Sequence, residues 1–71
     1  MNIYGYAQNK DDLLSLRDVT IKATPEEIRK VAEFLLHCAS MMERNTAWEH
    51  EHFNDYIKTS DFSSDIVVFA S

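Results

Sequence analysis

The chain has 71 residues, of which 45% are hydrophobic, and its formal net charge is −5. This length has room for one small domain, residues 1–71, and the hydrophobic share argues against an intrinsically disordered chain. The acidic charge argues against nucleic-acid binding, which needs a basic surface to displace counterions from phosphates, and favours a basic protein partner. No apolar run is long enough to cross a bilayer, and the N-terminus shows no secretory signal.

Cysteine usage indicates the compartment. Cys38 is the only cysteine, so an internal disulfide is impossible. It lies near the apolar side of a predicted helix, which favours a buried, reduced thiol that packs as a small hydrophobe. Both features favour a cytoplasmic protein.

The N-terminal part of the chain predicts two strands. Residues 2–7 have strand composition and alternate, so that Tyr4 and Tyr6 share one face. After a polar turn, the leucines of residues 13–16 form either an irregular loop lid or the start of the next strand. Residues 17–23 alternate clearly and predict a second strand that pairs antiparallel with the first.

One long amphipathic helix is predicted over residues 24–44. Thr24 is a good N-cap, Pro25 suits the first helical position, and Glu27 completes a capping box with Thr24. At the other end, Asn45 is expected to adopt a left-handed cap.

Apolar residues of this helix recur at helical spacing, so one side of it should pack on a sheet. Phe34 and Met41 lie on one shoulder of that side, where they either touch a loop or contact a partner. On the polar side, Glu33 and His37 are spaced to pair along the surface. The stripe expected to face the sheet, with its two flanking residues last, is Ile28, Val31, Ala32, Leu35, Ala39, Met42, Leu36 and Cys38.

Residues 48–57 alternate again and predict a third strand, although neither of its faces is cleanly apolar. His50 and His52 share one face, whereas Phe53 and Ile57 are the expected inward anchors of the other. A β-bulge within this stretch would change that assignment.

A polar loop over residues 58–64 leads to residues 65–70, the strongest strand, which is apolar on both faces and so expected to be central or covered twice. The predicted fold class is α+β, a four-stranded and mainly antiparallel sheet in the order β-β-α-β-β with one long helix. A single helix covers one face of such a sheet. The other face would expose an aromatic patch, and patches of that kind mark interfaces.

A protein partner is therefore expected on the uncovered face. Trp48, at the entrance of its strand, suits a binding hot spot and a small core equally well. A second copy that covers the same face would give a homodimer, which is the alternative to a different partner. The residues expected to contact the partner are Tyr4, Tyr6, Trp48, His50, Glu51, His52 and Phe69.

Enzymatic chemistry is not expected. The sequence has no nucleophile elbow, no glycine-rich phosphate loop and no zincin helix, and it indicates no cofactor. His50 and His52 point the same way on a strand, roughly 6.5–7 Å apart, and could share a metal ion. Zinc needs at least three protein ligands, and no third is evident nearby, so a small metal-binding domain is only an alternative.

Four short motifs resemble a family of short bacterial proteins. They are Thr24-Pro25-Glu26-Glu27, Phe34-Leu35-Leu36, His50-Glu51-His52-Phe53 and Asp65-Ile66-Val67-Val68. Together they resemble immunity protein family thirty-two of the polymorphic-toxin systems, over most of the chain from residue 17 onward. The resemblance implies a cytoplasmic, non-enzymatic protein that protects a cell by binding and blocking a cognate toxin. Either the open face or an acidic rim of Glu49, Glu51 and Asp55 would meet that toxin.

Overall fold

A computed structural model of the chain describes residues 1–58 and 64–71. Two pairs of strands form two separate two-stranded antiparallel sheets, β1 with β2 and β3 with β4. The α+β class is confirmed, whereas the single four-stranded sheet is wrong. In chain order the elements are β1 (Tyr4–Gly5), β2 (Leu14–Ser15), α1 (Pro25–Arg44), β3 (His50–His52), α2 (Phe53–Ile57) and β4 (Val67–Phe69).

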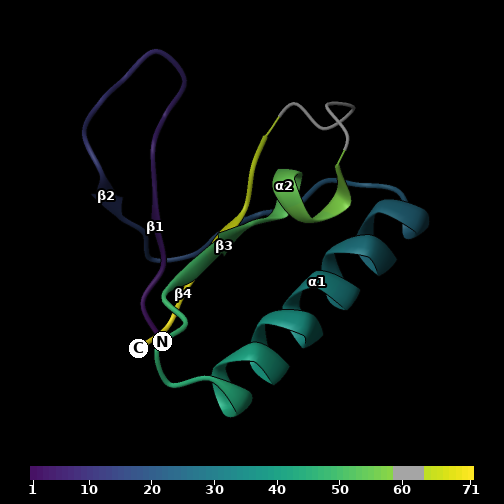
Figure 1. The fold of residues 1–71 in the computed structure, drawn as a ribbon. Coiled ribbons are helices and arrows are strands. Elements are labelled where there is room, and N and C mark those ends of the chain that lie inside the picture. The colour runs from purple at the N-terminus through teal and green to yellow at the C-terminus, as the bar shows by residue number, and fades with distance from the viewer. Residues whose placement is uncertain (59–63) are drawn as a thin grey trace.

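Figure 1 shows the β3–β4 sheet and α2 between the long helix α1 on one side and the β1–β2 hairpin on the other. The two chain ends lie close together in this view. Most of the polar loop predicted over residues 58–64 lies outside the described residues.

Helix α1 begins as its sequence predicts. The Thr24 hydroxyl accepts a hydrogen bond from the Glu27 backbone N–H at 3.2 Å, and the Glu27 carboxylate accepts one from the Thr24 N–H at 2.8 Å. The bond from the Thr24 backbone is the main reason that the pKa of Glu27 lies below its ordinary value. The helix ends at Arg44 as predicted, but the left-handed cap is wrong, because Asn45 is extended at φ −139 and donates its N–H to the Met41 carbonyl.

The side of α1 that packs inside the subunit overlaps the predicted stripe only in part, since of the predicted residues Val31 and Cys38 alone are buried. Phe34, expected on the shoulder, is 0% exposed, and Val31 and Cys38 are buried beside it. Met41, the other shoulder residue, is half-buried. The members of the predicted stripe that are exposed instead are Ile28, Ala32, Leu35, Leu36 and Ala39.

The aromatic core explains why α1 turns this side, rather than the predicted one, toward the rest of the subunit. The Phe34 ring lies 5.3 Å from the ring of Phe53 and 5.4 Å from that of Tyr56, between centroids. Tilted aromatic pairs add to the free energy gained by burying large rings, so Phe34 occupies the centre of the contact. The partly buried residues that pack around this cluster include Trp48, Ile57, Ile66 and Val68.

The second predicted strand is wrong in position. Residues 17–23 form no strand, and β2 lies just before them, within the leucine-rich patch. The Leu16 N–H donates to the Ile3 carbonyl at 2.7 Å and extends the β1–β2 pairing by one step. Alternation over residues 17–23 is not enough for a strand, because among the described residues no neighbouring strand forms backbone hydrogen bonds with them. Strand β4 is also not central, since β3 is its one sheet neighbour among the described residues.

The third predicted strand ends early, and α2 follows β3 directly. Phe53, Tyr56 and Ile57 are spaced i, i+3 and i+4, which fits one side of a helix as well as the predicted alternation. The N-cap residue of α2 makes no capping hydrogen bond with its own side chain. Asp65, which lies 11 residues after Asn54 in the chain, caps the helix instead, because its Oδ1 accepts the Asn54 backbone N–H at 2.9 Å.

The orientation of α1 can be tested with two truncations. Phe34→Ala should destabilise the chain by about 3–5 kcal/mol, enough to unfold most of a domain this small. Leu36→Ala, at a position that is 70% exposed, should change stability by less than about 0.5 kcal/mol. Urea denaturation followed by circular dichroism at low protein concentration measures both values. Equal losses for the two variants would contradict the packing described here.

Candidate functional site

Strands β3 and β4 place alternate side chains on opposite faces of their sheet. Glu51 and Val68 are paired across the strands, and both face α1: Glu51 contacts the helix residue His37, and Val68 packs on the core. Their neighbours along each strand must therefore point away from α1. These four residues, called the outer face from here on, are His50, His52, Val67 and Phe69.

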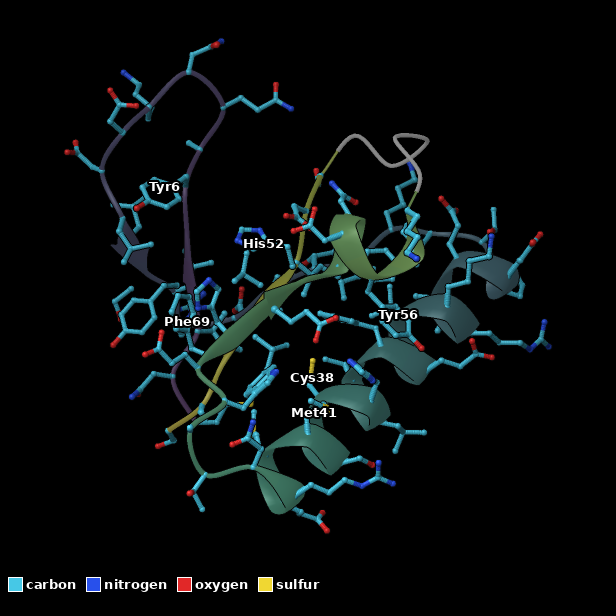
Figure 2. The ribbon with its side chains drawn as sticks, in the orientation of Figure 1. Tyr6, Cys38, Met41, His52, Tyr56 and Phe69 are labelled. Atoms are coloured by element: carbon cyan, nitrogen blue, oxygen red, sulfur yellow. The ribbon has the colours of Figure 1, made fainter. Side chains whose placement is uncertain are left out.

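The outer face is an aromatic surface open to solvent. The His50 ring stacks on the Phe69 ring with a centroid distance of 4.6 Å and an interplanar angle of 18°. The His52 ring meets His50 edge-on at 5.8 Å. Phe69 is nonetheless 66% exposed. Figure 2 shows Phe69 and His52 on the side of the sheet away from α1, whereas Cys38 and Tyr56 lie between sheet and helix.

Asp65 fixes one end of the outer face. Its Oδ2 lies 2.7 Å from His52 Nδ1, and its Oδ1 accepts the backbone N–H groups of Asn54 and Ile66, each at 2.9 Å. Burial raises the pKa of this carboxyl, but the hydrogen bonds from Asn54, His52 and Ile66 together hold the pKa below its ordinary value. The ionised carboxylate can only accept hydrogen bonds, so His52 Nδ1 is the donor to Asp65.

A second polar pair lies on the inner side of the sheet. His37 Nε2 is 2.9 Å from Glu51 Oε1, and both side chains are half-buried. The predicted pairing of His37 with Glu33 therefore gives way to a contact between α1 and β3. Glu51 faces the helix, so it does not belong to the acidic rim suggested by the sequence.

Cys38 lies beside this pair without forming a nucleophile. Burial raises the pKa of its thiol, and the charge of Glu51 raises it further. A reactive cysteine needs the opposite environment, one that stabilises the thiolate. The arrangement therefore suits a packed thiol rather than a catalytic one.

Of the seven residues predicted to contact a partner, the structure brings together the three that belong to the outer face. Tyr4 and Tyr6 are exposed but lie on the separate β1–β2 hairpin. Figure 2 labels Tyr6 there. Trp48 and Glu51 lie on the helix side of the sheet. Sequence reasoning missed the role of Asp65. A usable signal was present, because this carboxylate directly precedes an apolar strand, and that strand pairs with the strand that carries the histidines.

Within residues 1–58 and 64–71, no three or more His, Cys, Asp or Glu side chains gather in a way that could hold a metal ion. Nor does the described part of the chain contain a helix that is long and apolar enough to span a membrane.

Comparison with known proteins supplies the family. The model of the family described as Immunity protein 32 matches residues 18–70, which include α1, α2 and the whole outer face. The chain belongs to the Immunity protein 32 family. The resemblance noted in the sequence is thus confirmed, while no curated protein and no solved structure matches the chain. Membership of Immunity protein 32 indicates a toxin-neutralising role with a protein toxin as partner, in a family that is generally non-enzymatic.

The role of Asp65 gives a prediction about acid stability. Asp65→Ala should destabilise this Immunity protein 32 member by about 1–2 kcal/mol at neutral pH, since it removes a helix cap and a charged hydrogen bond. Because the folded-state pKa is lowered, the stability from ionised Asp65 is present above about pH 4 and lost as the pH falls through that lowered pKa.

The difference between wild type and variant should therefore narrow on acidification, as measured by chemical denaturation at a series of pH values. Asp12→Ala removes an exposed carboxylate elsewhere and is the control. A difference in unfolding free energy between wild type and Asp65→Ala that stays constant, or widens, in acid would contradict the assigned role.

Proposed function

We propose that this protein neutralises its cognate toxin by direct stoichiometric binding, with the outer face as the main contact surface. The observation that carries the proposal is the exposed stack of Phe69 and His50, which leaves a large aromatic surface in water. Aromatic side chains dominate the energetics of protein interfaces. The outer face also lies inside the region that matches the family, whereas the β1–β2 hairpin precedes that region.

Contacts within the subunit orient two side chains of the outer face, which supports its use in tight inhibition. His50 is held by its stack on Phe69, and His52 is held by Asp65, whose carboxylate is itself fixed by two backbone N–H groups. Side chains that are already fixed lose little conformational entropy on association, so more of the contact energy is retained as affinity.

The remaining residues predicted to contact the toxin have secondary roles in this proposal. Trp48 and Glu51 support the sheet from its inner side, and Tyr4 and Tyr6 add contacts from the hairpin. The net charge of −5 favours a toxin with a basic surface and would accelerate the encounter. The proposed place of action is the bacterial cytoplasm, where a free thiol such as Cys38 stays reduced.

A homodimer through the same outer face and a metal site at His50 and His52 were the alternatives. The metal site is disfavoured because the acid beside the two imidazoles, Asp65, is already bonded to His52 and to two backbone N–H groups. Within the described residues no three His, Cys, Asp or Glu side chains gather in a way that could hold a metal ion. A homodimer through the outer face would occupy the surface needed for the toxin, so the two uses exclude each other.

Replacing one aromatic ring tests the contact surface. Phe69→Asp should weaken toxin binding by roughly 30-fold or more, about 2 kcal/mol, because it removes the exposed ring and the stack that orients His50. Isothermal titration calorimetry with the purified toxin and survival of cells that express it are the two measurements.

Ser40→Asp adds the same charge at an exposed position of α1 and is the matched control, which should bind the toxin like wild type. Circular dichroism establishes that each variant is folded. A folded Phe69→Asp protein that still binds and protects normally would remove the outer face from the mechanism.

A further inference from the structure

Helix α1 carries two apolar stripes, and only one of them packs inside the subunit. The packed stripe centres on Phe34 and Cys38. The other, called the free stripe from here on, contains Ile28 and Leu35, which are 42% and 47% exposed. Its residues follow the 4-3-4-3 spacing found at the seam between two helices of a coiled coil. The free stripe consists of Ile28, Ala32, Leu35 and Ala39, which are exposed, and of Met42 at its C-terminal end, which is half-buried.

We infer that a second copy of this chain packs on the free stripe, with the two α1 helices antiparallel. Large and small side chains alternate along the stripe, which makes it complementary to itself. With a two-fold axis beside residue 37, Leu35 of each copy lies opposite Ala39 of the other. Ala32 then lies opposite Met42 of the second copy. Each large side chain enters the space beside a small one, as knobs-into-holes packing requires.

The flank of the free stripe selects the same register. Arg29, Leu36 and Glu43 recur every seven residues along it, and all three are exposed. In the antiparallel pair, Arg29 meets Glu43 of the second copy across this flank, offset by about 3 Å along the helix axis, and Leu36 meets Leu36 with the same offset. Neither Arg29 nor Glu43 has an ion-pair partner among the described residues of its own chain.

A parallel pair does not offer these contacts. In parallel coiled coils the flank of Arg29 faces the opposite flank of the partner helix. That opposite flank contains Val31 and Cys38, which are buried inside their own subunit and carry no charge. Arg29 and Glu43 therefore meet an opposite charge of the second copy only when the two helices run antiparallel.

The exposed area of the chain is consistent with more than one interface. Its accessible surface is 6279 Å² for 8.3 kDa, whereas a compact monomer of this mass exposes about 4,600 Å². The excess of about 1,700 Å² is roughly twice what each partner contributes to a standard interface. The free stripe does not include the outer face, so a dimer through α1 leaves both toxin-binding surfaces available. The dimer goes beyond the proposed function and does not depend on it.

Charge exchange across the two-fold axis gives the test, carried out on the protein alone. Sedimentation equilibrium over a wide concentration range should show a reversible dimer. Arg29→Glu and Glu43→Arg should each weaken the dimer roughly tenfold, about 1.4 kcal/mol, since each creates two like-charge contacts. The double variant Arg29→Glu/Glu43→Arg should restore the wild-type affinity, because it only swaps the partners.

Two more variants complete the experiment. Leu35→Lys should abolish the dimer, while Glu33→Arg, which changes the charge away from the stripe, should leave it intact. Leu35 is already half exposed, so circular dichroism should show an unchanged fold. A monomer at every concentration overturns the proposal, even if Leu35→Lys then weakens toxin binding and marks the stripe as a toxin surface. A dimer that survives Leu35→Lys but is lost in Phe69→Asp also overturns it.

Discussion

The contact between Phe34 and Phe53 determines where the other elements lie. It joins α1 to the start of α2, and the Phe53 N–H donates to the Ile66 carbonyl at 2.7 Å, which aligns the chain into β4. Among the described residues the buried side chains are only Val31, Phe34, Cys38 and Phe53. With so small a core, the orientation of one aromatic ring decides which stripe of α1 is covered and which is left in solvent.

The outer face depends on this core, because the β3–β4 sheet would not be stable without an element packed on it. Two paired strands are marginal in water unless another element packs on them. Here α1 covers the inner face through the aromatic cluster and through the contact of His37 with Glu51. Asp65 then joins the start of α2 to His52, so that the geometry of the two outer-face histidines depends on the buried side of the same strands.

Local signals in the sequence predicted the features that depend on local physics. The capping box at Thr24 and the alternation of His50 with His52 need only neighbouring residues, and both are present. The packed face of α1 was not predictable in this way, because two stripes one residue apart have the same period. Their competition is decided by Phe53, which lies far along the chain. Helix α2 was missed for a similar reason, since its cap comes from Asp65 rather than from its own N-terminus.

The small core also connects folding with binding. A domain of this size has a stability of only a few kcal/mol, and a partner that binds only the folded form adds to it by mass action. For the proposed toxin complex, a free toxin concentration of about a thousand times Kd would add about 4 kcal/mol, comparable with the stability of the chain alone. Apolar side chains that a larger protein would bury within itself are here exposed on α1 and on the outer face. In the proposed complexes, burial of these side chains by partners, rather than further internal packing, would stabilise the folded protein.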